Sequence, residues 1–283
     1  SNLAYISEGY SYQFGIYDIS DILNPIQLAS IPSFGYAHNA WLNETGTHLV
    51  TGEETVGMTV KIWDIQDLDN INLVGEYLGE NSLAHNVHVK GDFVYISHYT
   101  TGLKILDIFD PSDPIEVAAY DTYPDDDNDG FYGCWGAYPF TSNSYVYASD
   151  MQYGLFVFEF DDIQAGWVYG VITDENGPIE NVEIKSTLNG GIFTSNSNGY
   201  YEFGFPEGDQ TFEFFLDDTL LDIQTITIVP HETIEHDISF GVNGDINGDG
   251  LLNILDVVLI INQILSGQYD EASDLSGDGM LNI

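Results

Sequence analysis

The chain has 283 residues and a formal net charge of −42, because 46 acidic side chains face only four lysines and no arginine. A nucleic-acid partner or an anionic membrane surface requires clustered positive charge, so this composition argues against both. Aromatic residues make up 14% of the chain, which excludes an acidic disordered segment, and the single cysteine, Cys134, excludes an intrachain disulfide.

A short strand pattern that ends in an acidic residue recurs four times in residues 1–164. These acidic anchors follow one another at roughly 45 residues, the spacing of a repeat with several strands, and they are Asp18, Asp64, Asp107 and Glu159. Asp110-Pro111 and Asp113-Pro114 follow the third anchor and predict a turn, because proline cannot continue a strand ladder. The repeat predicts four-stranded blades of a β-propeller.

Two copies of the repeat contain four predicted strands each. The strands cover residues 37–42, 48–51, 59–65 and 72–77 in one copy, and 84–89, 93–98, 103–108 and 115–120 in the next. The first and last copies contain three strands, since no strand pattern precedes Ala4 or follows Phe160. Propellers use about four to eight blades. The expected fold of residues 1–164 is therefore an incomplete propeller ring.

Several segments of these copies contain characteristic sequence motifs. They are Ala37-His-Asn-Ala-Trp41, Ala84-His-Asn-Val-His-Val89, Tyr99-Thr-Thr-Gly-Leu-Lys-Ile-Leu-Asp107, Tyr120-Asp-Thr-Tyr-Pro124 and Gly154-Leu-Phe-Val157. Together they resemble the LVIVD-repeat propellers of secreted bacterial proteins of the choice-of-anchor B type, and only the C-terminal part of that propeller. The resemblance implies an extracellular or surface-bound module and brings no reaction with it.

His-Asn pairs occupy the same place in two copies, at His38-Asn39 and His85-Asn86, and Cys134-Trp135 stands there in the last copy. The strand that carries them is expected nearest the ring axis, where a ring of histidines could bind a transition metal. In the alternative interpretation each histidine satisfies backbone groups between blades, with His88 and His98 on blade surfaces. We expect the structural role.

Residues 125–130 have the Asp-x-Asp-x-Asp-Gly spacing that opens a calcium loop, in which glycine permits the sharp turn. The oxygen ligands would come from Asp125, Asp127 and Asp129. The twelfth position of such a loop is Gly136, which has no carboxylate. An acidic, solvated turn is therefore the preferred interpretation, with a calcium site as the alternative.

Residues 166–241 predict an antiparallel β-sandwich of seven short strands. Residues 167–182 contain two strands joined by a turn, and residues 194–203 form a hairpin in which Asn198-Gly199 favours positive backbone φ angles. Its turn glycines and core aromatics resemble the carboxypeptidase regulatory-like domain, a transthyretin-like sandwich. That resemblance implies an accessory spacer or binding module without peptidase chemistry.

Residues 242–283 contain the most specific motif of the chain, a loop with oxygen donors at alternate positions. A hard cation that takes six to eight oxygen ligands requires this spacing, and glycine at position six permits the turn. The expected calcium ligands are Asp245, Asn247, Asp249, the carbonyl of Leu251, Asn253 through a water, and Asp256. An EF-hand loop ends in glutamate and follows a helix, whereas this loop ends in Asp256 without one.

An apolar helix is expected over residues 257–265, ending at Gly267, and a second loop follows it. Its calcium ligands would be Asp274, Ser276, Asp278 and Met280. The chain stops at the tenth position of this loop, before the closing carboxylate, which leaves its occupancy open. The two loops resemble those of a dockerin, and the resemblance implies calcium binding and a cohesin-like partner. Ile254 and Leu255 stand where dockerins help to select that partner.

Three modules of this kind predict a non-catalytic, secreted or cell-surface bacterial scaffold that binds its cohesin-like partner or other copies of itself. A self-assembling extracellular fibre subunit is the alternative. No apolar run long enough to span a membrane is present. A third hypothesis is an enzyme that acts at the propeller axis. No nucleophile elbow, phosphate loop or zinc-binding helix in the sequence supports it. Its candidates are His38, His85, His98 and Asp150.

Overall fold

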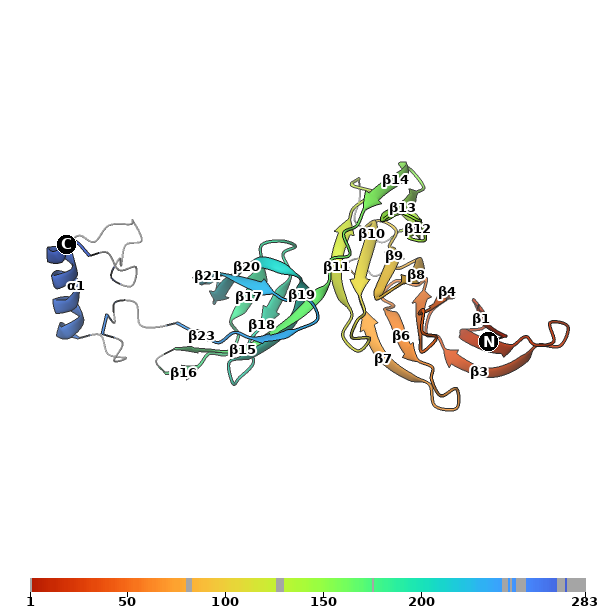
Figure 1. Ribbon diagram of the computed structural model, residues 1–283, viewed down its shortest axis with the longest axis horizontal. Coiled ribbons are helices and arrows are strands. Elements are labelled where there is room, and N and C mark those ends of the chain that lie inside the picture. The colour runs from red at the N-terminus through yellow and green to blue at the C-terminus, as the bar shows by residue number, and fades with distance from the viewer. Residues whose placement is uncertain are drawn as a thin grey trace. The chain divides into compact units, whose positions relative to one another are not determined.

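The computed structural model describes residues 2–79, 83–125, 130–174, 176–240, 244, 246–247, 253–268 and 273. Over these residues it contains 23 strands and one helix, so the expectation of a mainly β fold is confirmed (Figure 1). The chain divides into two compact units, residues 1–166 with 204–207, and residues 167–203 with 208–283.

The described residues of the first unit form four antiparallel sheets that follow one another along the chain. The first sheet contains β1 (Leu3–Ser7), β2 (Gln13–Asp18) and β3 (Ile26–Pro32). The second contains β4 (Ala37–Leu42), β5 (His48–Glu53), β6 (Val60–Asp64) and β7 (Asn72–Tyr77). The third contains β8 (Asn86–Lys90), β9 (Phe93–Ser97), β10 (Leu103–Asp107) and β11 (Ile115–Tyr120). The fourth contains β12 (Cys134–Tyr138), β13 (Tyr145–Asp150) and β14 (Gly154–Glu159). The strand positions predicted from the repeats are confirmed.

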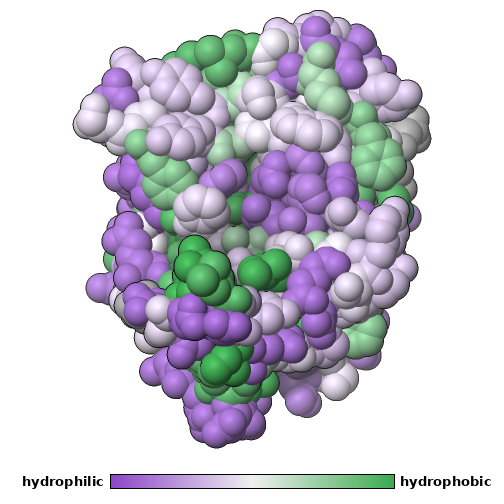
Figure 2. Space-filling model, turned by 90° about the vertical axis from the view of Figure 1, so that its right-hand side faces the viewer, coloured by the Kyte–Doolittle hydropathy of each residue, from purple (hydrophilic) through white to green (hydrophobic). Residues whose placement is uncertain are grey.

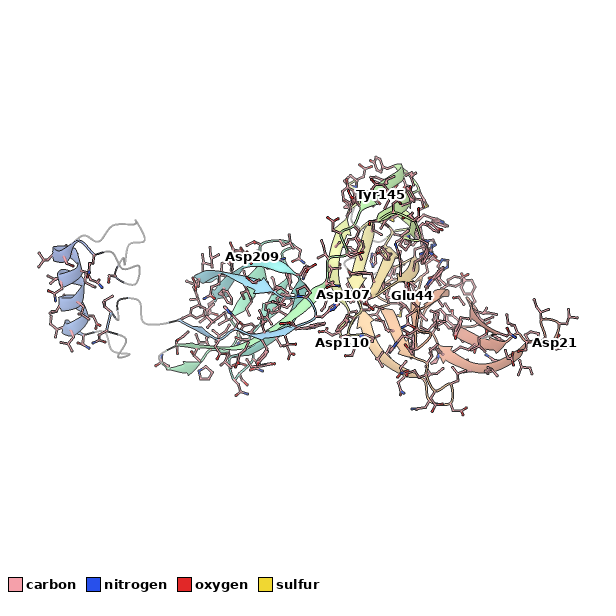
Figure 3. All side chains as sticks on the ribbon, in the orientation of Figure 1. Asp21, Glu44, Asp107, Asp110, Tyr145 and Asp209 are labelled. Atoms are coloured by element: carbon pink, nitrogen blue, oxygen red, sulfur yellow. The ribbon has the colours of Figure 1, made fainter. Side chains whose placement is uncertain are left out.

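The acidic anchors of the repeat end their strands by bonding to the backbone. A carboxylate oxygen accepts the amide two residues later, at 2.8 Å from Asp18 to Ser20, 3.0 Å from Asp64 to Gln66, and 2.7 Å from Asp107 to Phe109. Such a bond turns the chain out of the strand. A second aspartate three residues on repeats the bond, and Figure 3 labels Asp21 and Asp110 of this kind.

Apolar side chains fill the space between successive sheets, in one cluster for each pair. Val50, Ile62, Val87 and Ile96 belong to the cluster between the second and third sheets, where each is at most 1% exposed. The clusters on either side contain Phe14, Ile16 and Leu49, and Phe93, Val117 and Val146. Strands that pack on both faces lose the polar alternation of a surface strand. The result is a stack of sheets with three separate cores.

Three of the four lysines are either buried or make contacts between sheets. Lys61 is 5% exposed and its Nζ lies 2.9 Å from Oε1 of Glu53, a carboxylate that also accepts the amides of Phe34 and Gly35. Lys104 lies 3.6 Å from Glu116, and Lys90 donates to a backbone carbonyl. The outer surface is consequently acidic, and polar residues cover most of the face drawn in Figure 2.

The described residues of the second unit form nine strands in two sheets. Five form one sheet, namely β15 (Ala165–Asp174), β16 (Gly177–Pro178), β19 (Tyr200–Pro206), β22 (Thr233–Glu235) and β23 (Ile238–Ser239). Four form the other, namely β17 (Glu183–Ser186), β18 (Ile192–Thr194), β20 (Gly208–Leu216) and β21 (Thr219–Ile228). The sheets face each other, since Phe203 of the first stacks on Phe193 and contacts Phe212 of the second.

The expectation of seven strands, all antiparallel, is wrong for this unit. Strands β22 and β23 pair with β15 in parallel. After β21 the chain crosses from the four-stranded sheet to the other one, so it arrives beside β15 in the same direction. Parallel pairing needs such a crossover connection, which local sequence patterns do not reveal.

The only helix among the described residues, α1 (Ile254–Ser266), has well-defined ends. Asn253 caps its first turn by accepting the amide of Leu255 at 2.8 Å. Asp256 completes a capping box by accepting the amide of Asn253 at 2.8 Å. Gly267 ends the helix with a φ of 66°, a conformation that glycine adopts without strain. The predicted helix and its stop are confirmed.

Candidate metal centres

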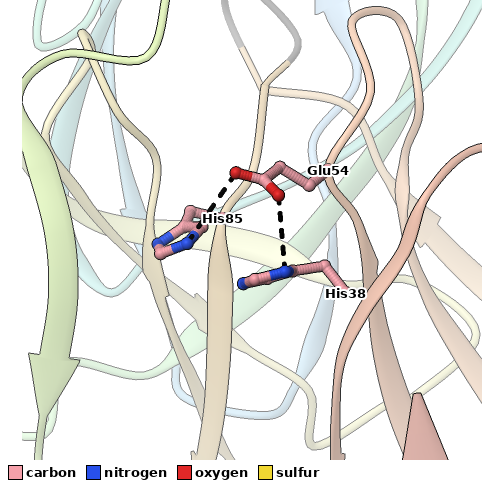
Figure 4. A group of neighbouring side chains, drawn as sticks. All are labelled: His38, Glu54 and His85. Atoms are coloured by element: carbon pink, nitrogen blue, oxygen red, sulfur yellow. Dashed lines mark ion pairs between the residues drawn. The ribbon is translucent and has the colours of Figure 1, made fainter. Parts of the chain in front are cut away.

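The structure brings three side chains of the first unit together, His38, Glu54 and His85 (Figure 4). His38 lies on β4, Glu54 directly follows β5, and His85 directly precedes β8. The Nδ1 atom of His38 lies 3.4 Å from Oε2 of Glu54, and Nε2 of His85 lies 3.8 Å from Oε1. One potential ligand atom from each residue lies within 4.8 Å of the others.

The asparagines of the two His-Asn pairs place the histidines side by side. Oδ1 of Asn39 accepts the amide of Val87 at 2.9 Å, which joins β4 to β8. Asn86 makes the equivalent link one sheet further, where its Nδ2 donates to the carbonyl of Trp135 at 2.9 Å. With the strands fixed in this way, the rings of His38 and His85 stack at 4.5 Å between centroids.

His85 is held in one orientation by its surroundings. The ring is 2% exposed, and its Nδ1 lies 2.5 Å from the carbonyl oxygen of Trp135. A carbonyl only accepts, so this contact favours the tautomer with the proton on Nδ1 and the lone pair on Nε2, toward Glu54; the amide nitrogen of Asn86 also lies 2.8 Å from Nδ1. Burial lowers the pKa of His85 below its ordinary value, although the Trp135 carbonyl acts in the opposite direction. The ring is therefore neutral at physiological pH.

Glu54 is held from the other side by Tyr99, whose hydroxyl donates to Oε1. Burial, and next the bond to Glu54, raise the pKa of Tyr99, so the hydroxyl keeps its proton. The side chain of Glu54 is 15% exposed, and none of the ion pairs among the described residues joins it to a lysine. Sequence reasoning missed both Glu54 and Tyr99, since neither belongs to a local ligand motif.

An open cleft of about 540 Å³ leads to this cluster, and His38 and Glu54 form part of its wall. Most of the remaining wall is aromatic, from Tyr10, Tyr12, Phe34, Tyr36 and Phe131. His85 lies behind the wall, between His38 and Trp135. A small molecule or ion can thus approach the carboxylate and one imidazole from solvent.

The other candidates of the axial-enzyme hypothesis lie outside this cluster. His98 bonds to Thr101 at 2.8 Å, and Asp150 accepts the hydroxyl of Thr122 at 2.8 Å. The expectation that His98 lies on a blade surface is wrong, because its residue is 3% exposed and burial lowers its pKa to about 4. His88 is half-buried against Trp41. Burial raises the pKa of the Cys134 thiol to about 12.

The first predicted calcium loop is described at Asn247, Asn253 and Asp256. Asp256 is 2% exposed, and its Oδ1 accepts the amides of Ile246 at 3.0 Å and Asn247 at 3.3 Å. Its carboxylate therefore points back into the start of the loop, as the closing position of a calcium loop must. The remaining predicted ligands, Asp245, Asp249 and Leu251, lie outside the described residues.

Of the other predicted calcium ligands, only Asp125 lies among the described residues. Asp125 accepts the hydroxyl of Tyr153, which lies 28 residues further along the chain, at 2.8 Å. Asp127 and Asp129 lie outside the described residues. So does the whole second loop, with its predicted ligands Asp274, Ser276, Asp278 and Met280.

Two parts of the chain match known families. Residues 83–122 match the LVIVD repeat, and residues 243–283 match the dockerin type I domain. Both resemblances found in the sequence are thereby confirmed for these residues. Dockerin type I domains bind calcium and cohesins, and they occur in extracellular and cell-surface proteins. The resemblance of residues 166–241 to the carboxypeptidase regulatory-like domain stays a prediction.

No curated protein matches the sequence. Among solved structures, one titled "Structure of U3-55K" aligns with 79% of this chain at 10% identity and a TM-score of 0.38. The alignment spans 61% of that structure's own chain. None of the helices in the described parts of this chain has the length and apolar character needed to cross a membrane.

Proposed function

We propose that this chain is a non-catalytic, secreted or cell-surface bacterial scaffold protein that attaches to its partner through a calcium-bound dockerin module. The observation that carries the proposal is the dockerin type I match over residues 243–283, together with the inward-facing carboxylate of Asp256. LVIVD repeats and dockerins are non-catalytic modules, which agrees with this assignment.

Calcium is the ion that the first loop suits best. Its proposed ligands are all oxygen donors, as a hard cation prefers, and several of them are carboxylates. They are Asp245, Asn247, Asp249, Leu251, Asn253 and Asp256. Bound calcium would offset the mutual repulsion of these carboxylates and so stabilise the loop and α1 together. The second loop, with Asp274, Ser276, Asp278 and Met280, is proposed as a weaker site, and Asp125, Asp127 and Asp129 as a solvated turn.

The start of α1 is the proposed contact with a cohesin-like partner. Ile254 is 70% exposed and Leu255 is 56% exposed, and both stand at the positions that help dockerins select a partner. Apolar side chains at this place favour a partner with an apolar rather than a hydroxyl-bonding surface. The helix therefore presents a surface whose specificity differs from that of dockerins with Ser-Thr at these positions.

The rest of the chain supplies the part that is attached. Residues 1–164 are proposed as blades of an LVIVD-type propeller, supported by the successive antiparallel sheets. Residues 166–241 are proposed as a carboxypeptidase regulatory-like sandwich, and residues 242–283 as the dockerin. In this arrangement the strand-built modules serve as binding modules or spacers, and the C-terminal module attaches the chain to its partner.

The test of this function measures α1 in the full chain by hydrogen exchange, with calcium and with EDTA. We expect the protection of residues 254–266 to rise by about 2.7 kcal/mol when calcium exceeds its dissociation constant 100-fold. An immobilised type I cohesin domain should bind the chain in calcium and release it in EDTA. Equal protection of α1 in both conditions would contradict the proposal.

Self-association is the second candidate, favoured by one strand edge. Within the described residues β14 is the outermost strand of its sheet, and its Leu155 and Val157 are 67% and 52% exposed. An apolar edge strand without a lysine is a template for pairing with another strand. If another copy of this chain is the partner, light scattering of the full chain will show oligomers that Val157→Lys removes. A monomer at all concentrations would exclude this candidate.

A further inference from the structure

The His38, Glu54 and His85 cluster contains the donor atoms of a transition-metal site. Imidazole nitrogens suit zinc, copper, nickel and iron, and two histidines with one carboxylate form a known ligand set for zinc. Calcium, by contrast, takes oxygen ligands. We propose that this cluster binds one divalent transition-metal ion, with Zn²⁺ as its simplest representative.

The distances between the ligand atoms are close to those that a metal ion requires. With zinc–ligand bonds of about 2.0–2.1 Å, neighbouring ligands of a tetrahedral ion lie about 3.3 Å apart. In the structure, Nδ1 of His38 lies 3.4 Å from Oε2 of Glu54, and Nε2 of His85 lies 3.8 Å from Oε1 of Glu54. These two contacts involve different oxygens of Glu54, and the three ligand atoms lie within 4.8 Å of one another, so binding an ion requires the side chains to draw closer together (Figure 4).

Two of the three ligands, His85 and Glu54, also have the outer partner that metal ligands usually have. Metal-bound histidines commonly donate their second N–H to a carbonyl or carboxylate, which fixes the ring and its tautomer. His85 does so to Trp135, and the hydroxyl of Tyr99 orients the carboxylate of Glu54. These contacts leave Oε2 of Glu54 without a hydroxyl donor and turn Nε2 of His85 toward the carboxylate, where the ion would bind.

The charge and access of the site also favour a cation. Glu54 is a largely buried carboxylate that meets two imidazoles and a hydroxyl but no lysine among the described ion pairs. A divalent ion would neutralise it. The fourth coordination position would face the aromatic cleft, where water or an external ligand can complete the shell. The site would thus be a metal-dependent binding site of the strand-built unit, separate from the calcium loop.

The test is zinc binding to the full chain, measured by competition with a chelating dye in excess calcium. Excess calcium occupies the oxygen-rich sites, so any zinc that still binds tightly is bound at the site with nitrogen ligands. We expect one such tight equivalent of zinc. His38→Gln and Glu54→Gln should each weaken it at least about 10-fold, the effect of removing even an outer partner, and Tyr99→Phe about 10-fold.

The matched control is His48→Gln, which removes another histidine at the opposite end of β5. It should leave the tight equivalent unchanged, as should Asp256→Ala in the proposed calcium loop. Circular dichroism and melting of each variant report folding, and His38 is the better target because its side chain is 26% exposed. The inference is wrong if no tight equivalent is found, or if folded His38→Gln and Glu54→Gln bind zinc like the parent.

Discussion

The two candidate metal centres gather their ligands in different ways. The calcium loop draws all of its proposed ligands from residues 245–256, so their spacing in the sequence already places them around one point. His38, Glu54 and His85 come from two sheets and meet because the asparagine links join β4 to β8 and β8 to β12. We therefore expect the loop to depend on its ion, whereas packed strands hold the histidine cluster without one. Four predictions test this contrast, from the largest effect to the smallest.

The first prediction concerns the buried ion pair that fixes the second sheet. Lys61→Met leaves the carboxylate of Glu53 buried without its cation, which should lower the free energy of unfolding by about 3–5 kcal/mol. Urea unfolding of the first unit, followed by tryptophan fluorescence, measures this. Lys185→Met, at an exposed lysine of the second unit, is the control. The double variant Lys61→Met with Glu53→Gln should recover most of the lost stability. If its free energy of unfolding is as low as that of Lys61→Met alone, the unpaired carboxylate of Glu53 is not the cause of the loss.

The second prediction concerns Asp256, on which the loop and α1 both depend. Asp256→Ala removes a buried carboxylate that accepts three amides and should lower the stability of α1 by about 3 kcal/mol in calcium. Hydrogen exchange of residues 254–266 measures the change, with the exposed Glu180→Ala as control. The melting of the first unit should stay the same in both variants. A parallel loss in both units would remove the contrast between ion-dependent and packed regions.

The third prediction is a pH dependence that originates in the first unit. The pKa of His98 is about 4 because it is buried and, to a lesser extent, because Lys104 is near, so the unfolded chain binds a proton more readily than the folded one. His98 therefore stabilises the fold above pH 6.5, and about 3 kcal/mol is lost as the pH falls from 6.5 toward 4.

Urea unfolding of the parent and of His98→Asn across this pH range isolates the effect from the many carboxylates. The parent should lose about 3 kcal/mol more than His98→Asn between pH 6.5 and 4. His48→Asn, at a half-buried histidine, serves as the control and should follow the parent. Identical slopes for the parent and His98→Asn would show that His98 charges without unfolding the unit.

The smallest effect is expected at the link between the second and third sheets. Asn39→Ala leaves the amide of the buried Val87 without its acceptor, at a cost of about 2 kcal/mol. Asn24→Ala removes a bond at an exposed turn and should cost less. Calorimetric melting of both variants gives the comparison. If Asn39→Ala melts like Asn24→Ala, the asparagine links do not fix the histidine cluster.

Local chemistry decided what could be predicted from the sequence. The anchors Asp18, Asp64 and Asp107 were recognisable because each one bonds two residues along, within the repeat itself. The stop of α1 at Gly267 was visible for the same reason, whereas the cap at Asn253 was not recognised and the predicted helix began three residues too late. Strand positions followed from alternation and turns, whose range is a few residues.

Contacts between distant segments were not visible. Glu53 and Glu54 are neighbours in the sequence, yet Glu53 meets Lys61 in the core while Glu54 turns toward two histidines. No spacing rule predicts these different partners, because they depend on which side of the sheet each side chain faces at the end of β5 and on the residues that the next sheet brings to that side. The parallel pairing of β15 with β22 and the burial of His98 depend on long-range contacts in the same way.

The placement of the four lysines has a further consequence, for digestion. Trypsin-like proteases cut after lysine or arginine, and this chain offers only Lys61, Lys90, Lys104 and Lys185. All four lie within strands, on β6, β8, β10 and β17. A protease must pull its substrate into an extended, unpaired segment, and exposed loop tips are where it normally succeeds. Lys90 ends β8 directly before the turn at Gly91, and the other three lysines are followed by further strand residues, so at those three sites a trypsin-like enzyme can cut only after the strand has left its sheet.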